Sequence, residues 1–116
     1  MNLANYCYNA MFMDCTTLTA APELPATGLA LACYNGMFNK CTSLTSAPTL
    51  PATTLALNCY YGMFYGCSNL TNIEVAFTEW RDDLNATKLW LNSVAVNGTF
   101  TKPASLSAEY GTSRIP

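Results

Sequence analysis

The stretch Cys-Tyr-Asn-Gly-Met-Phe-Asn-Lys-Cys-Thr-Ser-Leu-Thr-Ser-Ala-Pro-Thr-Leu-Pro-Ala-Thr, residues 33–53, has two close copies elsewhere in the chain. One copy begins at Cys7 and the other at Cys59, a step of 26 residues. The repeated columns are Cys7, Cys33, Cys59; Cys15, Cys41, Cys67; Met11, Met37, Met63; Phe12, Phe38, Phe64; and Leu18, Leu44, Leu70. Chance does not align so many columns, and a step of 26 lies within the roughly 20–29 residues of leucine-rich repeats.

Each copy divides into three predicted pieces. Leu3, Cys7 and Met11 recur every four residues, which predicts one face of a short helix over residues 3–13. The Cys-x-x-Leu-x-x-Ala segment that follows fits a bent strand, and Pro-x-Leu-Pro predicts an extended arm because proline fixes φ. Stacked copies would bury the repeated columns as ladders. The predicted fold class is therefore an α/β solenoid of three 26-residue leucine-rich rungs with a C-terminal cap.

The repeat decays after the third copy, which divides the chain. Residues 1–75 are expected to form the repeat array, with the first rung incomplete on its N-terminal side, and residues 76–116 the capping segment. Trp80 and Trp90 are the largest apolar residues of this segment, and Trp90 is expected to seal the last rung. The pattern predicts a helix over about 86–95 and, after the Asn97-Gly98 turn, a strand over 99–101.

Composition excludes several functions. The chain of 116 residues has no histidine, which removes the usual general base and the commonest metal ligand. We therefore expect neither an enzyme nor a cofactor or metal site. A net charge of −2 provides no basic surface for nucleic acid. No stretch approaches the roughly 20 apolar residues that a membrane span needs, so no membrane insertion is expected.

The repeated motif Cys-Tyr-x-x-Met-Phe-x-x-Cys-x-x-Leu-Thr-x-Ala-Pro-x-Leu-Pro-Ala-Thr resembles the BspA-like leucine-rich repeats of surface proteins in gut and oral anaerobic bacteria. The resemblance covers Leu3 to about Ala76 and continues in the cap at Trp90-Leu91 and Gly98-Thr99-Phe100. It implies an extracellular or cell-surface protein that takes part in display, adhesion or binding. No signal peptide is present and both ends look cut, so we expect a piece of a longer natural protein.

The six cysteines have several possible roles. Cys7 and Cys15 on one helix would lie about 12 Å apart, beyond the roughly 4.4–6.8 Å between the Cα atoms of a disulfide; diagonal pairs stay open. Zinc would need close Cys-x-x-Cys pairs, which the sequence lacks. No histidine is present to activate a catalytic thiolate. Small buried hydrophobes in a core ladder are the favoured interpretation.

Two further features have a functional and a structural interpretation. Exposed tyrosines could form a binding stripe, although half-buried tyrosines with hydroxyls in water are favoured; the column is Tyr8, Tyr34 and Tyr60, with Tyr6 and Tyr61 beside it. Asp82 and Asp83 near Glu79 could suggest glycosidase carboxylates or a calcium site, but a solvated surface of the cap is favoured.

A repeated Thr/Ser face on the predicted strands is the candidate binding surface, and its residues are Thr19, Thr45, Ser46, Thr71 and Asn72. The leading hypothesis is a non-catalytic binding, adhesion or display module whose partner is a host or bacterial surface protein or a glycan. The alternative is a structural spacer or capping fragment without binding activity. The first rung would leave Leu3, Cys7, Met11 and Phe12 uncovered, which favours self-association, most simply head to head about a two-fold axis.

Overall fold

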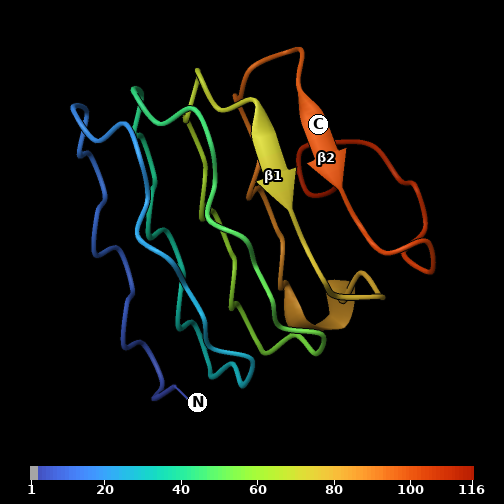
Figure 1. The fold of residues 1–116 in the computed structure, drawn as a ribbon. Coiled ribbons are helices and arrows are strands. Elements are labelled where there is room, and N and C mark those ends of the chain that lie inside the picture. Colours follow the sequence, from blue (N-terminus) through green and yellow to red (C-terminus); the bar gives the residue numbers. More distant parts are fainter. Residues whose placement is uncertain (1–2) are drawn as a thin grey trace.

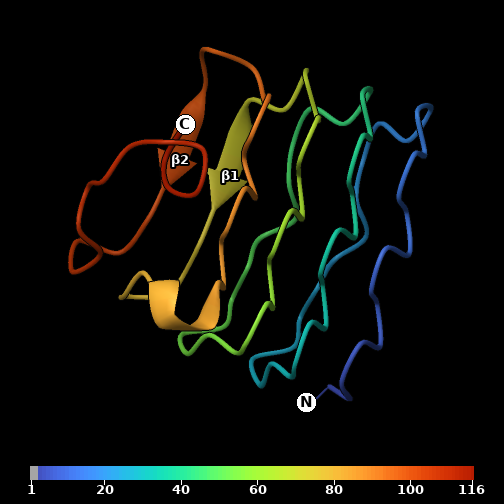
Figure 2. The ribbon, with the colours of Figure 1, turned by 180° about the vertical axis from the view of Figure 1, so that it is seen from behind.

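The computed structural model describes residues 3–116, which contain three short regular elements. These are strand β1 (Asn72–Glu74), the 3-10 helix η1 (Asp82–Leu84) and strand β2 (Thr99–Thr101). β1 and β2 form a parallel pair with Asn72 opposite Thr99. The radius of gyration is 12.6 Å. Successive repeat copies lie side by side, with the C-terminal segment at one end (Figure 1, and from behind in Figure 2).

The predicted α/β solenoid of three leucine-rich rungs is wrong. Residues 3–116 contain no α-helix, and β1 and β2 are the only strands among them. The first two copies contribute isolated parallel bridges, Ala20 to Ser46 and Ser46 to Asn72, but no strand. The BspA-like rung of strand, arm and helix is therefore not the architecture of this chain. The helix predicted over 86–95 is also absent, whereas the strand predicted over 99–101 is confirmed as β2.

Left-handed residues explain why no helix forms. Within 6–14, 32–40, 58–66 and 85–93, every fourth residue has a φ between 48° and 76°. These residues are Tyr6, Ala10, Asp14, Ala32, Gly36, Lys40, Asn58, Gly62, Gly66, Asn85, Leu89 and Ser93. An α-helix needs negative φ throughout, so it cannot continue past them. The chain instead forms consecutive hydrogen-bonded turns, as where Cys7 N–H donates to the carbonyl of Ala4 at 3.3 Å. The four-residue recurrence thus reflects turns rather than a helical face.

The N–H groups at alternate residues of these turns donate to the next copy. The bonds from the first copy to the second run from Tyr6 to Leu31, Tyr8 to Cys33, Ala10 to Asn35, Phe12 to Met37 and Asp14 to Asn39. The same five positions of the second copy donate to the third, and those of the third donate to residues 84–92, so that all fifteen distances lie between 2.7 and 3.1 Å. Every bond in this set runs from one copy to the copy that follows it.

Aromatic rings stack in two columns between the copies. One column joins Tyr8, Tyr34 and Tyr60 at centroid distances of 5.8 and 6.1 Å. The other joins Phe12, Phe38 and Phe64 at 5.5 and 5.6 Å. Trp90 closes both columns, 6.0 Å from Tyr60 and 6.4 Å from Phe64. The core is therefore continuous from the second copy into the C-terminal segment.

Burial of the repeated columns falls towards the first copy. Met37 and Met63 are buried, whereas Met11 is 58% exposed. Leu44 and Leu70 are buried and Leu18 is half-buried. The buried cysteines are Cys33, Cys41, Cys59 and Cys67, while Cys7 is exposed and Cys15 half-buried. The difference arises because no described segment covers the outer side of the first copy.

Candidate functional site

One face of the molecule carries the predicted row of hydroxyl and amide side chains. The two isolated bridges and the β1–β2 pair align the row across four neighbouring segments. All five predicted residues are exposed there: Thr19, Thr45, Ser46, Thr71 and Asn72. We call this surface, together with Thr99 and Thr101 of β2, the polar face. The structure thus places the candidate binding residues on neighbouring segments, where all of them are exposed.

Hydrogen bonds between neighbouring segments hold the polar face in place. The backbone N–H and the hydroxyl of Thr71 both donate to the carbonyl of Thr45, at 3.0 and 3.2 Å. The side-chain amide of Asn72 donates to the hydroxyl of Ser46 at 3.4 Å. Within residues 3–116 the hydroxyls of Thr19 and Thr45 have no hydrogen-bond partner. The face therefore combines a fixed backbone with side-chain groups that a ligand can reach.

Sequence reasoning predicts the strand at 99–101 but misses its place on the polar face. Thr99 N–H donates to the carbonyl of Thr71 at 2.7 Å, which adds β2 as a further segment of the face. A Cβ atom on Gly98 would lie 2.2 Å from that carbonyl oxygen, so only glycine permits this approach. A groove of about 230 Å³ beside the pair is lined by Ala47, Thr49, Asn72, Ile73, Glu74, Thr99 and Thr101. Gly98 in the Asn97-Gly98 turn was the sequence signal for this close approach of β2 to Thr71.

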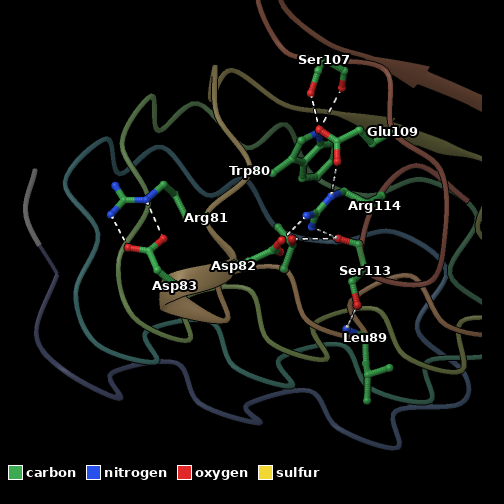
Figure 3. Close-up of polar contacts among 10 residues, drawn as sticks. Trp80, Arg81, Asp82, Asp83, Leu89, Ser107, Glu109, Ser113 and Arg114 are labelled. Carbon is green, nitrogen blue, oxygen red and sulfur yellow. Dashed lines mark hydrogen bonds and ion pairs between the residues drawn. The ribbon is translucent and has the colours of Figure 1, made fainter.

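Two acidic side chains of the C-terminal segment meet at Arg114, while Arg81 and Asp83 form a separate pair (Figure 3). The Arg114 guanidinium forms ion pairs with Asp82 and, at 3.2 Å, with Glu109. The same guanidinium lies over the Trp80 ring, 5.1 Å from the centroid. The indole N–H of Trp80 donates to the carbonyl of Ser107 at 3.0 Å. This cluster therefore ties residues 107–114 to the start of the C-terminal segment.

The paired acids are occupied by arginines. The hydrogen bond from Arg114 lowers the pKa of Asp82, and that from Arg81 lowers the pKa of Asp83. The hydrogen bond from the Ser107 hydroxyl, followed by that from Arg114, lowers the pKa of Glu109. A glycosidase needs one carboxyl with a raised pKa to act as the acid. The cluster lacks such a group and has the chemistry of an ion-paired surface.

Four of the six cysteine thiols, those of the second and third copies, lie among packed side chains. All six cysteines are free. Burial raises the pKa of both Cys59 and Cys67 to about 12. The Sγ–H of Cys67 donates to the carbonyl of Phe38 at 3.0 Å, and that of Cys41 donates to Phe12 at the same distance. A reactive cysteine needs a lowered pKa. These thiols act as small core residues that also satisfy a carbonyl of the preceding copy.

The tyrosine column does not form an exposed stripe. Tyr34 and Tyr60 are buried in the stacked core, and burial raises the pKa of Tyr60 well above its usual value. Tyr8 is half-buried and Tyr6 is 57% exposed at the outer edge. The buried hydroxyl of Tyr60 has no partner within residues 3–116. Tyr34 and Tyr60 therefore belong to the core, and the column does not form the exposed stripe that the sequence left open.

The described residues contain no candidate metal centre, and the comparisons give no family. Within residues 3–116, histidine, cysteine, aspartate and glutamate form no cluster of three that could hold a metal ion. Over the same residues, no helix has the length and hydrophobicity needed to cross a membrane. Comparisons with family models, with curated proteins and with solved structures found no match. The polar face is thus the best-defined candidate site.

Proposed function

We propose that the chain is a non-catalytic binding module that presents its polar face to a protein or a glycan. The observation that carries the proposal is the alignment of exposed hydroxyl and amide groups over neighbouring segments, namely those of Thr19, Thr45, Ser46, Thr71, Asn72, Thr99 and Thr101. Threonine and serine lose little side-chain entropy when a ligand immobilises them. The seven residues carry no charge and Glu74 lines the groove beside them, so neutral polar ligands suit the face.

The hydrogen-bonding groups of the polar face also match those of such ligands. Hydroxyl groups both donate and accept hydrogen bonds, and a sugar or an exposed peptide backbone presents the same mixture. Water-mediated contacts would add to direct ones on so open a surface. The free hydroxyls of Thr19 and Thr45 would make the first such contacts.

Charge substitution on the polar face tests this function. The double variant Thr45→Glu, Ser46→Glu places two carboxylates on the face without removing a buried group. The matched control is Thr53→Glu, Thr54→Glu, because these residues are also exposed but lie outside the face. Labelled wild type and both variants are applied to arrays of neutral oligosaccharides and of surface proteins.

The proposal expects wild type and control to bind the same spots and the face variant to lose at least about tenfold in affinity. Equal binding by the two variants would show that another surface is responsible. If wild type binds to neither array, the structural spacer would be favoured as the function.

A further inference from the structure

The outer edge of the first copy carries a row of unpaired backbone carbonyls. Within residues 3–116, no N–H group donates to the carbonyls of Asn5, Cys7, Asn9, Met11 and Met13. The equivalent carbonyls of the second copy each accept a bond of 2.8–3.0 Å; these belong to Leu31, Cys33, Asn35, Met37 and Asn39. The outer edge is therefore the same surface that neighbouring copies cover elsewhere, and no segment of residues 3–116 lies on it.

An apolar groove runs beside these carbonyls. It has a volume of about 370 Å³, and its apolar lining includes Leu3, Tyr8, Met11, Phe12 and Leu24. The Tyr8 and Phe12 rings are half-buried because each has a stacked neighbour on one side only. Hydrogen-bond acceptors and aromatic faces therefore lie on the same side of the first copy.

The opposite end of the stack is closed by the chain itself. The N–H of Leu89 donates to the Ser113 hydroxyl at 2.9 Å, and the N–H of Leu91 donates to the carbonyl of Thr112 at 3.3 Å. The indole of Trp90 donates to the carbonyl of Arg114 at 3.0 Å. Residues 112–114 therefore occupy the side on which a further copy would receive N–H groups.

We propose that the outer edge binds a further 26-residue repeat segment, in the register that relates the copies within this chain. The segment would donate backbone N–H groups at alternate residues to the five free carbonyls. Its tyrosine and phenylalanine rings would stack on Tyr8 and Phe12, as the second copy stacks under the third. This is recognition by backbone pairing with side-chain pockets for specificity.

A second intact copy of this chain fits the edge less well. Two outer edges placed head to head bring carbonyl groups against carbonyl groups, and neither offers an N–H donor. A head-to-tail contact would require residues 112–114 to leave Leu89 and Leu91. The occupant is therefore a repeat segment whose N–H side is open.

A synthetic peptide with the sequence of residues 27–52 is the probe. It carries the donor positions that correspond to Tyr34, Gly36 and Phe38, and it is labelled and titrated with the full chain under reductant. The matched control peptide is N-methylated at Tyr34 and Phe38, which removes two donors and keeps both rings. Loss of two hydrogen bonds should weaken binding by roughly 5- to 150-fold.

A fusion protein tests the same pairing without requiring a free peptide to bind tightly. Residues 27–52 are placed directly before residue 1, which keeps the 26-residue register and raises the effective concentration of the segment. Its amides at positions 34, 36 and 38 should exchange with solvent at least about 100-fold more slowly than in the free peptide. The melting temperature should rise by about 4 °C or more. A control fusion carries Tyr34→Ser and Phe38→Ser in the added segment only, and it should lose this protection.

Three outcomes would overturn the proposal. In the first, amides of the fused segment exchange as fast as those of the free peptide. In the second, the N-methylated peptide binds as tightly as the unmodified one. In the third, the chain alone forms a dimer that protects its own edge. The test is independent of the polar face, because neither Thr45 nor Ser46 lies at the outer edge.

Discussion

Replacement of Trp90 by alanine should cost this chain a large part of its stability. The side chain is 0% exposed and closes both aromatic columns. Its ring lies 6.0–6.4 Å from five other aromatic rings, those of Tyr60, Phe64, Phe77, Trp80 and Phe100. Its indole N–H also donates to the carbonyl of Arg114. One substitution therefore removes the contact between the repeat copies and the C-terminal segment.

The size of the effect follows from burial. Replacing a core phenylalanine or tryptophan by alanine costs about 3–5 kcal/mol. A domain of this length has a free energy of unfolding of roughly 6–17 kcal/mol. The variant Trp90→Ala should therefore melt about 10–20 °C lower than wild type. Trp90→Phe keeps an aromatic ring and loses the indole hydrogen bond, so its loss should be roughly 1–2 kcal/mol.

Urea denaturation followed by circular dichroism checks this order. The three proteins should unfold with similar slopes and with midpoints in the order wild type, Trp90→Phe, Trp90→Ala. Trp80→Ala serves as a control, because this tryptophan is only half-buried and should cost less. A melting temperature for Trp90→Ala within a degree or two of wild type would refute the role of Trp90 as the closing residue.

Three further perturbations have defined outcomes. Gly98→Ala places a Cβ against the carbonyl oxygen of Thr71 and should destabilise by about 1–3 kcal/mol; unchanged urea midpoints would contradict this approach of β2. In the native chain at pH 8, Cys7 should react promptly with a thiol reagent and the buried thiols slowly, whereas all six should react after denaturation without reductant; fewer would indicate disulfides. The pKa of Asp82 is lowered in the folded chain, so its contribution is present above the unfolded value of about 3.9 and is lost as pH falls through the folded value. Amides of residues 89–91 should therefore lose protection below about pH 4, beyond the change in intrinsic exchange. Asp82→Asn should reduce this pH dependence and leave the part that Glu109 contributes; an unchanged profile in the variant would exclude Asp82 as a cause.

The sequence alone predicts that successive repeat copies pack next to each other. Columns such as Phe38 and Phe64 must find apolar partners, and one copy cannot bury its own apolar residues. In the structure these rings stack on each other across the 26-residue step. The candidate face could be predicted for the same reason, because a fixed step places Thr45 beside Thr71 once the copies lie in register.

Helix content could not be predicted from the same pattern. A recurrence of four residues is close to the helical period of 3.6, and it equally fits a run of four-residue turns. Gly36, Gly62 and Gly66 were the available signal, because glycine adopts positive φ without steric cost. The first copy has Ala10 and Asp14 at the equivalent left-handed positions. Its sequence therefore conceals the turns that the other copies reveal.

The direction of the hydrogen bonds between copies is a property of the backbone that no side-chain pattern records. An apolar outer edge alone suggests that two copies of the chain meet head to head. The structure adds that this edge presents acceptors at alternate residues, while the opposite end, at Leu89 and Leu91, presents donors that residues 112–113 satisfy. The two ends of the stack are therefore chemically unlike. A partner that matches the aromatic rings of Tyr8 and Phe12 but lacks free N–H groups would leave five carbonyls without donors, and this requirement selects among apolar partners.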